Sequence, residues 1–98
     1  MLVRIAIAQI DVIPGRPDLN CESILAAIEK AKHDNIELIA FSEMALPGYF
    51  LGDMWEQPAF LRDCEYYGER IIEASAGICI AFGNVAVDWN KKGNDGRT

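Results

Sequence analysis

The sequence lacks any apolar run close to the ~20 residues that a membrane-spanning helix requires. Its first residues, MLVRIAIAQIDV, also lack the basic start and the small-residue cleavage site of a secretory signal peptide. We therefore expect no contact with a membrane, and we expect the protein to be cytoplasmic.

Basic residues are scarce. Nine Lys and Arg residues stand against fifteen Asp and Glu residues, which gives a net charge of −6. This sign is wrong for an electrostatic hold on phosphate backbones or anionic lipids. No nucleic-acid partner is expected.

Cysteine and histidine are also few. Cys21, Cys64 and Cys79 are widely spaced and form no CxxC pair, and His33 is the single histidine. This pattern excludes a disulfide framework and predicts no metal site. The three cysteines fall on apolar faces of predicted elements, so we expect them to be buried, reduced and inert. His33 is expected to be solvated at the end of a helix.

What the chain does contain is an alternation of strand and helix patterns. Residues 2–10, 36–41 and 78–83 read LVRIAIAQI, IELIAF and ICIAFG, which predict buried parallel strands, the first of them central in its sheet. Apolar residues at helical spacing predict one helix that ends near His33, with Asp18 or Asn20 as its N-cap, and a second that starts at Pro58 and is closed by Gly77. The order is that of right-handed βαβ units and predicts an α/β fold.

The last residues resemble the start of a hairpin. Residues 85–90, VAVDWN, alternate like a half-exposed fourth strand, and KKGNDG is typical of a turn. Only two residues follow, so we expect the chain to stop within the hairpin. A strand without its partner recruits other chains, and we expect a homo-oligomer whose interface includes Val85, Val87 and Trp89. Lys91 and Lys92 are expected to be solvated turn residues, and Trp55 and Trp89 packing aromatics.

Glu43 lies two residues after the end of the second predicted strand. In α/β sheets, ligands bind outside the carboxyl ends of the parallel strands. Glu43 is therefore placed where chemistry is usually performed, although its position alone also fits an acid that caps the next loop or pairs with a lysine.

The residues around Glu43 strengthen the functional interpretation. A first strand that ends in Ala8-Gln9-Ile10, with FSE at residues 41–43 followed by ALPGY at 45–49, resembles the nitrilase superfamily of carbon–nitrogen hydrolases. Ser42 departs from the proline that is usual before the glutamate. The resemblance implies an α-β-β-α sandwich, of which residues 1–98 would form the N-terminal portion of a hydrolase domain, truncated within the hairpin.

The resemblance also implies a Glu-Lys-Cys triad. Glu43 matches the glutamate of the triad, while the lysine and the nucleophilic cysteine would lie beyond Thr98. Residues 46–61, LPGYFLGDMWEQPAFL, are most similar to the glutaminase domains of the NAD synthetase subfamily, in which Tyr49 would line the glutamine pocket. The implied function is hydrolysis of glutamine to supply ammonia for NAD synthesis from deamido-NAD and ATP.

This resemblance sets the expectation for cofactors. ATP and magnesium would belong to a synthetase domain outside these residues, no cofactor is expected in this chain, and the chain alone is expected to be inactive. Two alternatives stay open: another amidase or N-carbamoyl amidohydrolase of the same superfamily, and a non-enzymatic α/β binding module.

Overall fold

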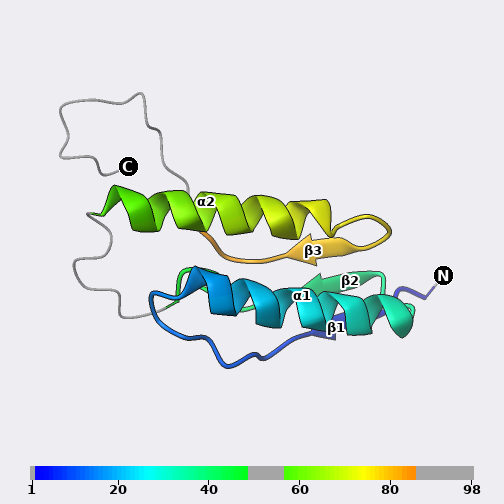
Figure 1. Cartoon of the computed structure of the whole chain (residues 1–98). Helices are drawn as coiled ribbons and strands as arrows, with labels where there is room; N and C mark the ends of the chain where they lie inside the picture. Colours follow the sequence, from blue (N-terminus) through cyan, green and yellow to red (C-terminus); the bar gives the residue numbers. More distant parts are fainter. Residues whose placement is uncertain (1, 49–56, 86–98) are drawn as a thin grey trace.

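A computed structural model of the protein describes residues 2–48 and 57–85 and shows two βα units in succession, closed by a third strand (Figure 1). The elements are β1 (Ile5–Ile7), α1 (Pro17–His33), β2 (Leu38–Ala40), α2 (Pro58–Glu73) and β3 (Cys79–Ala81). The three strands are parallel and lie in the order β1-β2-β3. The prediction of an α/β fold is confirmed.

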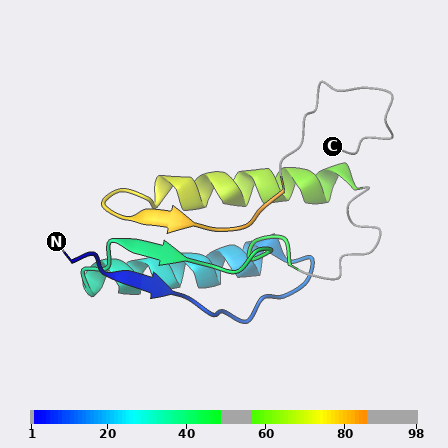
Figure 2. The same ribbon diagram turned by 180° about the vertical axis from the view of Figure 1, so that it is seen from behind.

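Both helices pack on the same face of this sheet. Figure 1 views the molecule from the helix side and Figure 2 from the strand side. Between the layers lies an apolar core built from α1, α2, β2, the turn that follows β2 and the residue before β3. Its buried residues are Cys21, Ile24, Ile28, Ala31, Ile39, Ala45, Leu46, Ile71 and Ile78. Burial of this apolar surface is what holds the helices against the sheet.

The end of α1 and the start of α2 follow the predictions, whereas α2 ends at Glu73, with Ala74 as its C-cap, and is not closed by Gly77. The start of α1 also differs from the prediction. That helix ends at His33, whose side chain is exposed, and Asn35 follows in the left-handed region with φ 59°. The N-cap position is occupied by Arg16, so the prediction of Asp18 or Asn20 as N-cap was wrong. Pro17 fixes the start instead, because its locked φ and missing N–H suit the first helical position.

The strands are shorter than predicted, and β1, which was predicted to be central, is an outer strand among the three that the structure describes. Its side chains alternate, so that Ala6 faces the helices while Ile5 and Ile7 point the other way and are 60% and 80% exposed. No described element covers that second face. Cys79 pairs in register with Leu38 on β2 and is also exposed, which corrects the prediction that all three cysteines are buried.

Several predicted features fall outside the described residues. These are Tyr49, Trp55, Val87, Trp89, Lys91 and Lys92. Val85 is described, is not part of a strand, and packs against a small cluster of Phe60, Leu61 and Cys64. Among the helices that the structure describes, none is long and apolar enough to cross a membrane.

Candidate active site at the carboxyl ends of the strands

Glu43 begins a turn three residues after β2 ends at Ala40. The chain leaves the sheet at Phe41, whose N–H donates a hydrogen bond to the carbonyl of Ala81 at 2.8 Å, and residues 43–47 then form the turn. Within it, the N–H of Ala45 donates to the carbonyl of Ser42 at 3.2 Å. The Glu43 residue is exposed, so its carboxylate stands in solvent at the carboxyl edge of the sheet.

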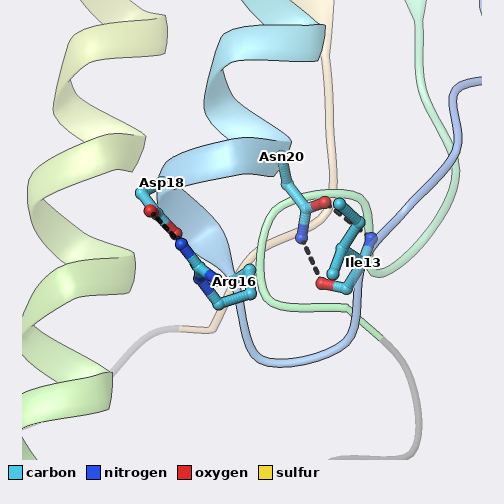
Figure 3. A network of polar contacts seen from close by, with 4 residues as sticks. All are labelled: Ile13, Arg16, Asp18 and Asn20. Carbon is cyan, nitrogen blue, oxygen red and sulfur yellow. Dashed lines mark hydrogen bonds and ion pairs between the residues drawn. The ribbon is translucent and has the colours of Figure 1, made fainter.

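Asn20 anchors this turn from the side of α1. Its side chain accepts a hydrogen bond from the N–H of Ile13 at 2.7 Å and donates to the carbonyl of Ile13 at 2.8 Å (Figure 3). The same amide nitrogen donates to the carbonyl of Leu46 at 2.9 Å, and the residue is fully buried. Asn20 therefore joins the loop after β1 to the turn that carries Glu43.

The sequence contained a signal for this role that the N-cap interpretation overlooked. Asn20 lies four residues before Ile24, which in turn lies four before Ile28, so all three share one face of α1. A polar residue on an apolar helical stripe must find buried partners.

Nearby, Arg16 and Asp18 form an exposed ion pair at 2.9 Å (Figure 3), and the hydrogen bond and charge of Arg16 lower the pKa of Asp18.

The far end of the turn is held by the loop that precedes α1. The N–H of Gly15 donates to the carbonyl of Pro47 at 3.0 Å. Gly48 has φ +92°, and a Cβ at that position would lie 2.6 Å from the Cα of Pro14. Glycine is needed there both for its backbone conformation and for the close approach of the two loops.

A depression opens beside the turn at the carboxyl ends of β1 and β2. It is lined by residues 7–12 together with Phe41 and Ser42. Its polar groups come from Gln9, Asp11 and Ser42, and the two strand ends supply its apolar wall. A small polar ligand could therefore be held between the two strand ends, one residue away from Glu43 along the chain.

The described cysteines do not supply a nucleophile for Glu43. Burial raises the pKa of the Cys64 thiol to about 12 and also raises that of Cys21. Both thiols therefore stay protonated near neutral pH, as the prediction of inert buried cysteines requires. Cys79 is exposed, on the face of the sheet that the helices leave uncovered.

The described part of the chain also supplies no lysine near Glu43. Its two lysines, Lys30 and Lys32, lie in the last turn of α1, at the opposite end of that helix from Asn20. Within the same part, no group of three or more His, Cys, Asp or Glu residues could hold a metal ion. Of the predicted site, the structure places Glu43, while Tyr49 lies outside the described residues.

No family model matches the chain. Individual proteins do match it. The chain is 39% identical over 82 residues to a glutamine-dependent NAD(+) synthetase of Xylella fastidiosa (strain Temecula1 / ATCC 700964), and 34% identical over 82 residues to one of Xanthomonas campestris pv. campestris (strain 8004). Each match covers 83% of this chain and 15% of the relative. The chain thus spans a small part of the length of these relatives.

A solved structure gives the same result for the fold. The crystal structure of a glutamine-dependent NAD(+) synthetase from Cytophaga hutchinsonii superimposes with a TM-score of 0.64 at 28% sequence identity. The superposition covers 80% of this chain and 13% of that one. Two parallel βα units and a third strand are therefore an arrangement that this chain shares with a segment of a known enzyme.

Proposed function

This chain is a homologue, over most of its length, of glutamine-dependent NAD(+) synthetases, and we propose that residues 1–98 form the N-terminal portion of a glutaminase domain. The observation that carries the proposal is the sequence identity to these synthetases. Glu43, at the carboxyl edge of the sheet, supplies an acid–base group for the proposed reaction. The domain would cleave the side-chain amide of glutamine and supply ammonia for the synthesis of NAD.

Glu43 acts as the proton relay of this reaction. It takes the proton from a cysteine thiol, and the thiolate attacks the amide carbon to form a tetrahedral oxyanion. Glu43 returns the proton to the amide nitrogen and the C–N bond breaks. Ammonia departs, and an acyl-enzyme thioester remains. Glu43 then takes a proton from water, which attacks the thioester to release glutamate and restore the thiol.

The other two members of the triad come from residues beyond Thr98. As the resemblance to the nitrilase superfamily implies, a lysine there stabilises the oxyanion and a cysteine there is the nucleophile. Tyr49 lines the glutamine pocket. ATP and magnesium serve a synthetase domain outside this chain, where ammonia reacts with the activated deamido-NAD. We place this reaction in the cytoplasm, a reducing compartment that suits free thiols.

The geometry supports a relay role for Glu43 in two ways. The residue is exposed, so its carboxylate can reach a reacting group above the edge of the sheet. The backbone that carries it is nevertheless fixed, by the buried amide of Asn20 on one side and by the residues after β3 on the other. A relay group needs both properties, because proton transfer depends on a well-defined distance.

The proposal is tested in the full-length polypeptide that contains this segment. Ammonia release from glutamine is compared between the wild type, Glu43→Gln and Glu37→Gln. Glu37 is an exposed acid just before β2, so it controls for the loss of one charge at the other end of the same strand. Loss of a general acid–base group lowers turnover by ~10²–10⁴-fold. We expect that loss in Glu43→Gln and near-normal turnover in Glu37→Gln.

Two outcomes would contradict the proposal. One is a Glu43→Gln enzyme that keeps its turnover of glutamine. The other is a wild-type enzyme that hydrolyses small amides or N-carbamoyl compounds and leaves glutamine intact, which would assign the domain to a different branch of the nitrilase superfamily.

We also propose that the 98-residue chain by itself forms a homo-oligomer with a second copy of the same chain. The support is the uncovered face of the sheet, where Ile5 and Ile7 are exposed on a strand whose outer edge has no described partner. Strands of parallel sheets are usually covered on both faces, and open edges pair with other chains.

A further inference from the structure

The residues that follow β3 run between the Glu43 turn and α2. Two hydrogen bonds bracket Glu43 along this path. The N–H of Phe41 donates to the carbonyl of Ala81 at 2.8 Å, and the N–H of Leu46 donates to the carbonyl of Gly83 at 3.2 Å. The segment after β3 therefore extends the contact between β2 and β3 beyond the end of the sheet and into the turn.

Gly83 lies directly against the backbone of Glu43. A Cβ built on Gly83 would overlap the carbonyl carbon and oxygen of Glu43, and it would lie 3.0 Å from the Cα of Glu43. These atoms belong to the backbone, so no change of rotamer can relieve the overlap. Gly83 is not in the left-handed region, unlike Gly77. The requirement for glycine at position 83 thus comes from the close approach alone.

Asn84 fixes the same segment on its other side. Its side-chain amide donates to the carbonyl of Cys64 on α2 at 3.0 Å, and its side-chain oxygen accepts from the N–H of Val85 at 2.8 Å. A Cβ on Gly68, one turn further along α2, would lie 2.6 Å from the amide nitrogen of Asn84. A glycine in the middle of a helix costs stability, and here it makes room for this side chain.

We propose that Gly83 and Asn84 are positioning residues for Glu43. Asn84 ties the segment after β3 to α2. Because Gly83 has no side chain, that segment can lie directly against the backbone of Glu43. The position of α2 thereby determines where the Glu43 carboxylate lies relative to the carboxyl edge of the sheet. This inference rests on the proposed relay role of Glu43.

A substitution at position 83 displaces Glu43 without removing its carboxylate. A misplacement of about 1 Å in a reacting group can lower the rate ~10²-fold. The effect falls on turnover, because the relay acts on the transition state rather than on bound glutamine. A loss of stability alone would leave the kcat of the folded fraction unchanged.

The test compares Gly83→Ala with Gly77→Ala in the full-length polypeptide, each at a temperature where both variants are folded. Gly77 lies just before β3, at the other end of that strand, with φ +83° and no heavy atom within 4 Å of an added Cβ. Its substitution therefore lowers Tm through backbone strain without a contact to Glu43. We expect Tm to fall in both variants, with kcat for glutamine ~10²-fold lower in Gly83→Ala alone and KM within about threefold of wild type in both.

A second variant decides the question if Gly83→Ala does not fold. Asn84→Asp keeps an oxygen for the N–H of Val85 and loses the donor to the carbonyl of Cys64. We expect its kcat to be about tenfold lower, with KM little changed. Unchanged kcat in Asn84→Asp would overturn the inference, as would equal kcat values in the two glycine variants.

Failure of the inference can be distinguished from failure of the proposed function by Glu43→Gln in the same assay. An active Glu43→Gln enzyme overturns the relay role and the positioning inference together. An inactive Glu43→Gln enzyme with a fully active Gly83→Ala enzyme overturns the positioning inference alone.

Discussion

The side-chain amide of Asn20 donates a hydrogen bond to the carbonyl of Leu46, 26 positions away in the chain, at 2.9 Å. Both residues are fully buried. This bond connects the first turn of α1 to the turn that begins at Glu43, and the same side chain satisfies both backbone groups of Ile13. The fold and the candidate site therefore share one buried polar side chain.

Asn20→Ala is expected to destabilise the fold strongly. The substitution leaves the N–H of Ile13 and the carbonyl of Leu46 without their partner, while the carbonyl of Ile13 keeps the N–H of Arg16 at 3.2 Å. Each buried polar group that loses its hydrogen bond costs about 1–3 kcal/mol, so we expect the free energy of unfolding to fall by at least about 2 kcal/mol. Urea denaturation measures it, with the exposed α1 position Glu22→Ala as control. Equal midpoints for the two variants would refute this role of Asn20.

The raised pKa of Cys64 predicts a loss of stability at alkaline pH. The pKa of an unburied thiol is 9.0, and burial raises the pKa of the Cys64 thiol to about 12 in the folded protein. Above pH 9.0 the unfolded chain binds fewer protons than the folded one, so stability falls as pH rises toward about 12. The contribution is fully present below pH 9.0. The free energy of unfolding of Cys64→Ala should therefore depend less steeply on pH in this window, and identical slopes would contradict the assignment.

The three cysteines should differ in their rates of alkylation. Cys79 is exposed on the uncovered face of the sheet, while Cys21 and Cys64 are buried. Iodoacetamide labelling of the folded chain, followed by peptide mass spectrometry, should modify Cys79 first. The two buried thiols should react at the rate of unfolding. Equal labelling of all three in the native protein would show that the helix layer does not pack as described.

Self-association of the 98-residue chain should depend on the uncovered face of the sheet. Ile7→Lys places a charge at the more exposed of the two β1 isoleucines, and Ile72→Lys places the same charge on an exposed position of α2. Size-exclusion chromatography with light scattering should show an oligomer for the wild type and for Ile72→Lys, and a shift toward monomer for Ile7→Lys. A monodisperse wild-type monomer at micromolar concentration would contradict the proposal.

The 98-residue chain alone should release no ammonia from glutamine. A general acid–base group contributes ~10²–10⁴-fold and accomplishes little without a nucleophile. The assay compares the purified chain with its Glu43→Gln variant. Ammonia release by the chain that disappears in Glu43→Gln would mean that a nucleophile lies within these residues.

Local patterns determined much of the fold. The spacing of apolar residues on α1 and the fixed φ of Pro58 depend on neighbours in the sequence, so the end of α1 and the start of α2 could be predicted. The location of Glu43 followed equally well, because it depends only on where β2 ends and on the parallel order of the strands.

What the sequence could not supply depends on contacts between distant segments. The strand predicted from residues 2–10 is apolar on both faces, so its pattern contains no information on which face the helices cover or whether β1 lies at an edge. Asn20 looks like a helix cap until Leu46 is placed beside it. Gly83 looks like an ordinary strand end until the Glu43 backbone is found against it. Each of these relationships is a tertiary contact.

The most direct test of the account measures glutamine turnover and glutamine binding on one preparation of the full-length Glu43→Gln enzyme. A relay acid acts on the transition state, so we predict that kcat falls by ~10²–10⁴-fold while the dissociation constant of glutamine stays within about threefold of wild type. A Glu43→Gln enzyme with near-normal kcat would contradict the assignment of Glu43 and the function built on it.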